Sequence, residues 1–298
     1  MPIRVRIRLF AIQRELAGAR EIALELAPGA TIEAAWAALV ERHPVLASGR
    51  PAVRFARNGE YADPETTLGN GDELAIIPPV SGGDEAGIEP GGEVAAAGAE
   101  RTGEPGGNIP VGARRILELR ADPFDSTILT DLGDALATDA DGAVVGFIGR
   151  TRETPGTPAA GQEAEAARHA GRAVESLGYE AHEPMALAML ARIADEIAER
   201  FGVVRLAIVH RTGEVPLGEP SVAIVAVSPH RDSAFEAARY AIDETKARAP
   251  IWKAERFADG HVWVGEIARD GPVTPDSRSS AAKSSAAKSS AAADREAR

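Results

Sequence analysis

The chain has 298 residues, 44% of them hydrophobic, which is enough for two ordinary domains that each bury an apolar core. Its formal net charge of -12 argues against nucleic acid or an anionic membrane as a partner, and the absence of cysteine excludes disulfides, thiolate metal sites and a cysteine nucleophile. No apolar run approaches the roughly 20 residues that span a bilayer, and the start lacks a signal-peptide pattern, so we expect a cytoplasmic protein.

The beginning of the chain has the pattern of a small mixed sheet covered by one helix. Ile3 to Leu9 alternate apolar residues with arginines, as in a strand with one buried face. Further elements are predicted as a strand at 22–26, a helix at 32–43 capped by Thr31, a hairpin at Asn58-Gly59 and a strand at 73–77. This order favours the ubiquitin-like β-grasp arrangement.

The first unit ends in the run Pro78-Pro79-Val80-Ser81-Gly82-Gly83. Prolines stiffen the exit, and glycines without Cβ atoms let an enzyme approach the terminal carbonyl closely. An isolated glycine pair would favour a simple hinge. After a predicted strand, however, this run resembles the end of the small, sulfur-carrying subunit of molybdopterin synthase. The resemblance implies a ubiquitin-like sulfur-carrier domain at 1–83, with Gly82 and Gly83 as the sulfur-carrier terminus.

A flexible linker is predicted at 84–112, because this segment is rich in Gly, Ala, Glu and Pro and has few large apolar side chains. In the resembling family the terminal glycine of the carrier is activated as a carboxylate, which an internal peptide bond does not offer. We therefore expect cleavage after Gly83, next to an exposed acidic segment. Without cleavage, a separate carrier subunit would supply the sulfur.

The second domain is predicted at 113–269 and opens with strands at 116–119 and 143–149. The pattern of Phe147, Gly149 and Arg152 follows, in which glycine permits a close approach and arginine can hold a phosphate. An arginine after a strand is also often only a surface cation. The stretch 154–175 is predicted to be a loop or a loose helix near the pocket mouth.

Strand and helix patterns continue along the second domain. The predicted elements are a helix from Pro184 to Gly202, strands at 206–211 and 222–227 joined by a loop containing Gly213 and Pro216, and a strand at 262–264. His210 is interpreted as a half-buried polar strand residue, because no partner ligands have metal-site spacing. The low-complexity tail at 270–298 is given no chemistry.

Cations gather around the predicted helix between the last two strands. Ser233 and Glu236 have capping-box spacing, which predicts a helix that begins near Ala234 and is ended by Pro250. The same interpretation places His230 and Arg231 at its entrance, Lys246 near its exit and Lys253 just beyond, an arrangement that favours an anionic ligand. Alternatively, Lys246 only complements the helix dipole and pairs with Asp243 on a solvated face.

This segment carries a long family pattern. Ser-x-His-Arg-x-Ser-Ala-Phe-Glu from Ser228, followed by Lys-x-Arg-Ala-Pro-x-Trp-Lys from Lys246, resembles the large, catalytic subunit of molybdopterin synthase. The resemblance implies an α+β protein in which an N-terminal ubiquitin-like β-grasp domain is linked to a C-terminal α/β hammerhead-type domain. It also implies a homodimer formed through the catalytic domain.

The resemblance further implies the reaction. Cyclic pyranopterin monophosphate (precursor Z) would receive sulfur from a glycine thiocarboxylate and become the dithiolene of molybdopterin. Lys246 and Lys253 would be catalytic, and Phe147, Arg152, His230 and Arg231 would bind the substrate. No metal or permanently bound cofactor is expected.

Sulfur would arrive as a thiocarboxylate on Gly83, or on a separate carrier, and adenylating and sulfur-donating enzymes would be the partners that charge it. The competing hypothesis is a non-catalytic assembly or regulatory protein with a ubiquitin-like binding module. Retention of the arginine, histidine and lysines of the pattern argues against that alternative.

Overall fold

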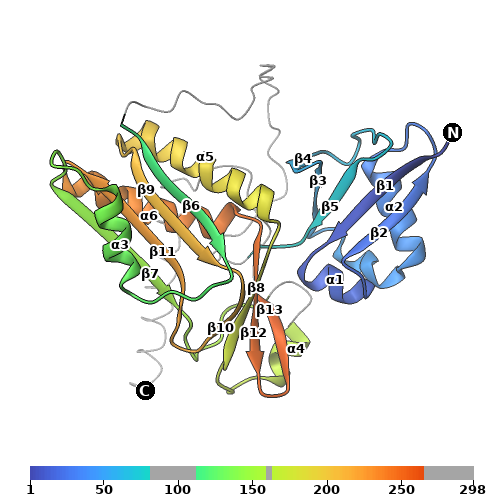
Figure 1. The fold of residues 1–298 in the computed structure, drawn as a ribbon. Coiled ribbons are helices and arrows are strands. Elements are labelled where there is room, and N and C mark those ends of the chain that lie inside the picture. Colours follow the sequence, from blue (N-terminus) through green and yellow to red (C-terminus); the bar gives the residue numbers. More distant parts are fainter. Residues whose placement is uncertain (81–111, 159–162, 265–298) are drawn as a thin grey trace, which may run out of the picture.

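The computed structural model describes residues 1–80, 112–158 and 163–264. Figure 1 shows a small mixed sheet with its helices on the right, and a larger layered unit on the left with a narrow second sheet below it. Gly82, Gly83, nearly all of the predicted linker and the low-complexity tail lie outside the described residues.

The first unit has the predicted β-grasp arrangement. Its sheet has the order β2-β1-β5-β3-β4, in which β1 is parallel to β5 and the other neighbours are antiparallel. The elements are β1 (Ile3–Leu9), α1 (Ala11–Ala17), β2 (Glu21–Leu26), α2 (Ile32–Arg42), a 3₁₀ turn (Pro44–Gly49), β3 (Arg54–Arg57), β4 (Glu60–Tyr61) and β5 (Glu73–Ile77). The short helix α1 was not predicted.

Local signals explain the elements that were predicted in this unit. The Thr31 hydroxyl accepts a hydrogen bond from the Ala34 N–H at 3.2 Å, which caps α2. Asn58 and Gly59 have φ of 52° and 88°, the positive values that a tight hairpin between β3 and β4 requires. The apolar side of α2 packs on the inward-facing side chains of the sheet.

The second unit contains two four-stranded sheets, with the orders β6-β9-β11-β7 and β10-β8-β12-β13. Its elements are β6 (Arg114–Arg120), α3 (Ile128–Leu136), β7 (Ala143–Arg150), α4 (Glu163–Arg168), β8 (Ser176–Ala181), α5 (Glu183–Phe201), β9 (Arg205–Arg211), β10 (Gly213–Pro216), β11 (Pro220–Ser228), α6 (Arg231–Arg248), β12 (Ile251–Phe257) and β13 (Gly260–Val264).

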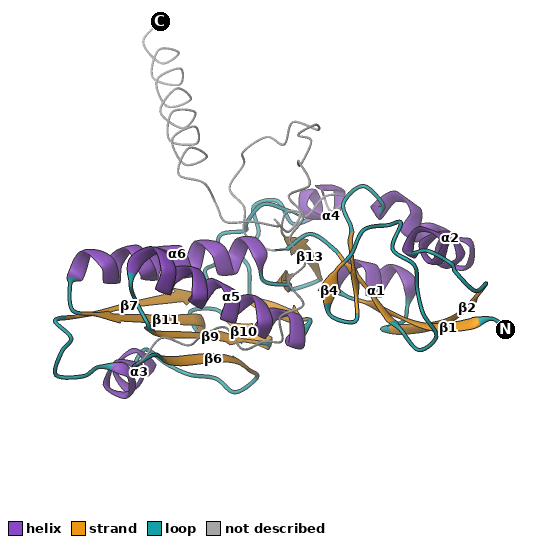
Figure 2. Cartoon of the chain, turned by 90° about the horizontal axis from the view of Figure 1, so that it is seen from above, coloured by secondary structure: helices purple, strands orange, loops and turns teal. Residues whose placement is uncertain are grey.

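Helices cover both faces of the larger sheet, as Figure 2 shows, with α5 and α6 on one side and α3 on the other. Alternate residues of β9 divide between these faces: Leu206 and Ile208 pack with α5 and α6, whereas Ala207 and Val209 pack with α3. The sheet is therefore buried on both sides, which matches the continuous apolar runs of β9 and β11 in the sequence.

The start of α6 differs from the prediction. The helix begins at Arg231, and His230 is its N-cap with extended backbone angles and no side-chain cap hydrogen bond. The predicted capping box of Ser233 and Glu236 is therefore wrong, because both residues already lie inside the helix. The strand β11 ends at Ser228 and leaves only Pro229 and His230 for the turn.

The smaller sheet was the main omission. Its strands β8 and β12 were not predicted, and the segment expected to be a loop with Gly213 and Pro216 forms β10, which pairs antiparallel with β8. The residues of this sheet lack a long apolar run, so pairing with distant neighbours decides their conformation. Pro216 is tolerated because β10 is an edge strand.

Candidate functional site

Helix α6 has cationic residues at its two ends. His230 is the N-cap, Arg231 is the first helical residue, and Lys246 lies in the last turn. At about 1.5 Å per residue, Arg231 and Lys246 are separated by roughly 22 Å along the helix axis. The predicted site residues thus form two groups within one chain, and His230 and Arg231 are exposed at the end remote from Lys246.

The strand β12 places Lys253 beside the C-terminal end of α6, since only Ala249 and Pro250 separate the two elements. Burial lowers the pKa of the Lys253 ammonium, whose side chain is 24% exposed, while the negative charge of Glu255 opposes this shift. The positive charges of Lys246 and Arg152 lower the pKa of Lys253 further. Lys246 and Arg152 are therefore each close enough to Lys253 for their charges to act on it.

The segment around Arg152 forms another wall of this cationic cluster. Phe147 on β7 packs against the apolar core beneath α5 and α6, and Arg152 is exposed just after the strand. A Cβ atom at Gly149 would lie 2.7 Å from Cγ1 of Val222 on the neighbouring strand β11. The close strand contact thus requires glycine at this position.

The stretch that follows Arg152 folds back over β12. The backbone N–H of Gly156 donates to both carboxylate oxygens of Glu255, at 2.9 and 3.0 Å, and Pro158 forms a bridge with Val264. Glu255 is only 3% exposed, and its Oε1 lies 3.4 Å from Nζ of Lys253. Its carboxylate therefore joins the catalytic candidate to the stretch predicted to lie near the pocket mouth.

Two further residues, His210 and Tyr179, belong to the same region. Tyr179 on β8 lies directly opposite Lys253 on β12, and opposite residues of a strand pair face the same way. The Tyr179 ring meets the His210 ring edge-on, with centroids 4.8 Å apart. Burial lowers the pKa of His210 to about 4, and the charge of Lys246 acts in the same direction.

Sequence reasoning placed His210 on a strand but did not include it in the site. The histidine is 8% exposed and thus more deeply buried than expected. A polar residue that continues the inward-facing series of Leu206 and Ile208 was the available signal. Tyr179 gave none, because its strand was not predicted.

The tail of the β-grasp unit lies against the residue next to Lys253. The Trp252 indole N–H donates to the Pro78 carbonyl at 3.0 Å, and Val80 is 1% exposed in the same apolar cluster. Phe10 stacks on Trp252 with ring centroids 4.8 Å apart. The carrier-like unit is therefore docked on the second unit of the same chain through its outer sheet face.

Polar contacts surround this docked cluster. Nε2 of His261 lies 3.0 Å from the Glu15 carboxylate, and the Ala11 N–H donates to Glu180 at 3.2 Å. The hydrogen bond with Glu15 raises the pKa of His261, although burial opposes that shift. An apolar centre with polar pairs at its edge is the usual anatomy of a specific interface.

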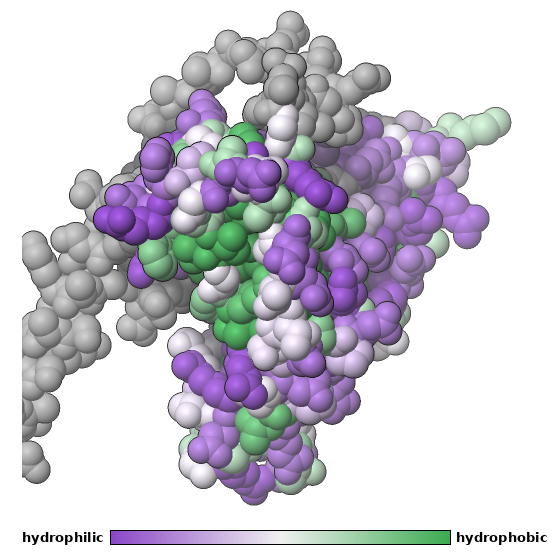
Figure 3. All heavy atoms as spheres, turned by 60° about the vertical axis from the view of Figure 1, so that its left-hand side comes forward, coloured by the Kyte–Doolittle hydropathy of each residue, from purple (hydrophilic) through white to green (hydrophobic). Residues whose placement is uncertain are grey.

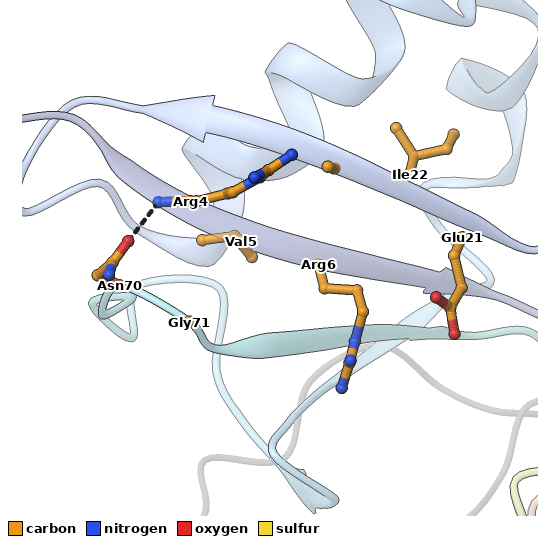
Figure 4. Close-up of a pocket in the computed structure, with 8 residues that line it drawn as sticks. Arg4, Val5, Arg6, Glu21, Ile22, Asn70 and Gly71 are labelled. Carbon is orange, nitrogen blue, oxygen red and sulfur yellow. Dashed lines mark hydrogen bonds between the residues drawn. The ribbon is translucent and has the colours of Figure 1, made fainter.

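The outer face of the β-grasp sheet continues beyond the docked area into a shallow hollow (Figure 4). Arg4 and Arg6 of β1 line it together with Glu21 of β2 and Asn70, and the Arg4 N–H donates to Asn70 Oδ1 at 2.9 Å. Arg6 also pairs with Glu73 at 2.8 Å. This remaining surface carries charged side chains, in contrast to the apolar part that contacts Trp252.

In the part of the chain that the structure describes, no three His, Asp or Glu side chains are grouped so that they could hold a metal ion. None of the described helices combines the length and the apolar character needed to cross a bilayer.

Comparisons with known proteins agree with this division of the chain. The model of the MoaE protein family matches residues 119–248, and the model of the ThiS family matches residues 7–83. The molybdopterin synthase catalytic subunit of Bacillus subtilis is 42% identical over 125 residues, which are 42% of this chain and 71% of that protein. The corresponding subunit of Culex quinquefasciatus is 38% identical over 138 residues, which are 46% of this chain and 79% of that protein.

Solved structures were matched as well. Molybdopterin synthase from Staphylococcus aureus aligns with a TM-score of 0.43 and 35% identity, covering 50% of this chain and 96% of that chain. Small archaeal modifier protein 1 from Haloferax volcanii aligns with a TM-score of 0.25 and 36% identity, covering 26% of this chain and 99% of that chain. From the sequence relatives, the chain belongs to the molybdopterin synthase catalytic subunit family, and it carries a ubiquitin-like ThiS-family domain in the same polypeptide.

Proposed function

We propose that this protein is a molybdopterin synthase that transfers sulfur from a glycine thiocarboxylate to precursor Z. One observation carries the proposal: the charges of Lys246 and Arg152 both act on Lys253, at the place where the carrier-like unit docks beside β12. Its family membership gives the protein a role in molybdenum cofactor biosynthesis. The sulfur transfer itself and its substrate are inferred from the chemistry of these residues.

The cationic cluster suits a substrate that bears a phosphate. Arg152 can form charge-assisted hydrogen bonds to phosphate oxygens. Phe147 packs in the core and thereby holds the strand β7, which Arg152 directly follows. Burial lowers the pKa of Lys253, so a larger fraction of its amine is neutral near physiological pH. We therefore assign acid–base transfer to Lys253 and Lys246, a contribution of roughly 10²- to 10⁴-fold in rate.

Sulfur would be carried by Gly83 after cleavage of the chain. The chain has no cysteine, so sulfur has to be held by another group. Gly83 is three residues beyond Val80, and an extended chain of that length reaches at most about 10 Å. Trp252 and Lys253 are neighbours on β12, so their side chains point to opposite faces of the sheet. Gly83 must therefore reach from the face of Trp252 to the face of Lys253.

Intact mass measurement of protein purified from cells that make molybdenum cofactor tests the cleavage. A fragment that ends at Gly83, found with or without added sulfur mass, is the expected result. Full-length chain as the sole species would contradict cleavage. A separate carrier subunit would then be the sulfur donor, and adding one to the full-length protein should restore turnover.

We further propose that His230 and Arg231 bind substrate in the pocket of a second copy of the chain. Their end of α6 lies near the exposed edge strand β7, where Val144 is 52% exposed, and Phe235 in the first turns of α6 is 62% exposed. Figure 3 shows apolar surface gathered on this side of the molecule. A homodimer through this face would cover these side chains and join the two groups of site residues.

Adenylating and sulfur-donating enzymes are the proposed partners of the carrier-like unit. The hollow that Arg4, Arg6 and Glu21 line with charged side chains stays accessible while the apolar part of the same sheet face contacts Trp252. An adenylating enzyme can therefore bind this surface before the carrier-like unit separates from Trp252. Pull-down of the adenylating enzyme by wild-type protein and by an Arg4→Glu, Arg6→Glu variant tests this; equal capture would contradict the assignment.

The decisive experiment is incubation of the purified protein with precursor Z and a sulfur-charging system. Molybdopterin and the mass of each chain fragment are followed together. Formation of the dithiolene by the wild type and its loss in a folded Lys246→Ala variant are expected. Near-wild-type turnover by folded Lys246→Ala protein would overturn the catalytic assignment.

The alternative, a non-catalytic assembly or regulatory protein, is not favoured, since the matched relatives are catalytic subunits. Titration of precursor Z separates the two hypotheses without any turnover. Saturable binding that weakens in Arg152→Ala supports the enzyme, whereas a regulatory scaffold should not bind the pterin.

A further inference from the structure

His210 is a buried ring in the wall of the cationic cluster, and the reaction as proposed above gives it no task. It continues the series of β9 side chains that face α5 and α6, because it lies two residues after Ile208 and four after Leu206. Its cross-strand partner Val222 belongs to the apolar cluster beneath α6. The ring therefore lies on the sheet face that α6 covers.

The hydrogen bond of His210 defines its tautomer. Nδ1 lies 2.7 Å from the carbonyl oxygen of Arg211. A carbonyl can only accept a hydrogen bond, so Nδ1 must carry the proton. Burial lowers the pKa of the ring to about 4, which leaves it neutral at pH 7. The other nitrogen, Nε2, is consequently an unprotonated acceptor.

Few groups around His210 can donate a hydrogen bond to Nε2. Tyr179 of β8 contacts the ring by its edge, and Leu119 of β6 pairs with it across the sheet. The neighbouring guanidinium of Arg211 is engaged by Glu219 at 2.7 Å. Glu118 and Arg120, the charged neighbours on β6, bond to each other at 2.6 Å.

Lys246 is the charged side chain that acts on the His210 ring, and its helix position supports a contact between them. It lies one turn after Ile242, which packs in the same apolar cluster as Tyr179 and Val222. The positive charge of Lys246 also contributes to the lowered pKa of His210. Lys246 is exposed, and the four-residue spacing from Ile242 puts the stem of its side chain on the side of α6 that faces the sheet, toward His210.

We propose that His210 is a positioning residue whose Nε2 accepts a hydrogen bond from the Lys246 ammonium and holds that side chain over the pocket. Tyr179 supports the arrangement from the other side, since it contacts His210 and lies opposite Lys253. One wall would then position both lysines. The catalytic meaning of this contact rests on the function proposed above, but the contact itself does not.

The contact is tested first without turnover. Nitrogen-15 NMR of the histidine rings should show His210 as the neutral Nδ1–H tautomer at pH 7. A protonated ring or the Nε2–H tautomer would overturn the proposal, because Nε2 could not accept. The measurement needs no variant, so misfolding cannot obscure it.

Amine labelling then reports on Lys246 directly. Acetylation by acetic anhydride at pH 7.5, read by peptide mass spectrometry, should be several-fold faster at Lys246 in His210→Phe, because phenylalanine keeps the ring but removes the acceptor. His210→Gln places an acceptor near the Nε2 position and should restore the slow rate. Lys283, a lysine outside the site, serves as the internal reference, and an unchanged Lys246 rate in a folded His210→Phe variant would overturn the proposal.

His169→Phe is the matched control. His169 is also a buried ring, 3% exposed, and stacks on Phe257 with centroids 4.4 Å apart near the far end of β12. Its substitution should leave Lys246 labelling and turnover unchanged. A change equal to that of His210→Phe would mean that any lost imidazole in this unit suffices, and would contradict a specific contact.

Turnover is measured last, in the same variants. His210→Phe should lower kcat about tenfold or more with a smaller change in KM, and His210→Gln should recover part of it. Lost turnover with unchanged labelling would overturn the positioning role. The NMR and labelling results without any wild-type turnover would instead refute the proposed function and leave the contact standing.

Discussion

The two ends of α6 are both cationic, yet they differ in what surrounds them. At the C-terminal end, Lys246 acts on Lys253 and His210, and the last helical residue Arg248 is fully buried. At the N-terminal end, His230 and Arg231 are exposed and followed by the exposed Phe235. The difference teaches that the C-terminal end is enclosed largely by residues of its own chain, although Lys246 itself is exposed, whereas the N-terminal end is open and, in our proposal, is covered by a second copy of the chain.

The largest effect is expected where the buried end is anchored. The Arg248 guanidinium contacts Glu196 at 2.6 and 2.9 Å and the fully buried Glu244 at 3.2 Å. Arg248→Met would leave these carboxylates without their cation and should cost about 3–5 kcal/mol of unfolding free energy, measured by urea denaturation. Arg231→Met, at the exposed end, is the control and should change stability by less than about 0.5 kcal/mol.

The next effect concerns catalysis at the C-terminal end of α6. Lys246→Ala and Lys253→Ala should each reduce dithiolene formation roughly 10²- to 10⁴-fold in single-turnover assays, because proton transfer loses its positioned group. Arg239→Ala, an exposed cation of the same helix, should keep its rate. An equal loss in all three variants would point to a general electrostatic effect and not to catalysis.

A mixing experiment tests whether the exposed end is completed by a second copy. Lys246→Ala protein and His230→Ala, Arg231→Ala protein should each be nearly inactive alone. After random exchange of subunits, half of the dimers are mixed and one of their two pockets has all its residues, so about a quarter of wild-type activity should return. No recovery, with exchange confirmed by mass, would place both ends in separate functions.

The smallest effect is a shift in pH dependence. The negative charge of Glu255 raises the pKa of Lys253 against the lowering effect of burial, so Glu255→Gln should lower the pKa of this lysine. The limb of the kcat/KM profile that reports the neutral amine of Lys253 should move to lower pH. Glu236→Gln, an exposed residue of α6, should leave the profile in place. Movement to higher pH would contradict the assignment.

Much of the fold could be predicted from local patterns, and the reasons are visible in particular elements. The alternation of apolar residues and arginines predicted β1. The Thr31 cap and the apolar side of the following helix predicted α2, and continuous apolar runs predicted β9 and β11. The strands β8, β10 and β12 could not be predicted, because their mixed residues become strands only by pairing with one another. Ser233 misled because capping-box spacing also occurs inside a helix whose start is set by the preceding strand.

The candidate site was predictable in its residue types but not in its grouping. The family pattern pointed to Lys246, Lys253 and Arg152, which the structure brings close together. The length of α6 separates His230 and Arg231 from them, and simple helix arithmetic could have revealed that distance from the sequence. His210 and Tyr179 meet across two sheets, and contacts of that kind depend on the completed packing.

The packing of Phe10, Pro78 and Val80 on Trp252 within one chain has a consequence for the relative amounts of the two units in the cell. Two freely diffusing subunits meet at a rate that depends on how much of each the cell makes. Here translation delivers both in equal numbers, and the tether gives the first encounter a local concentration in the millimolar range before any bulk abundance matters. A shortage of the carrier-like unit relative to the second unit therefore cannot arise during synthesis of this protein.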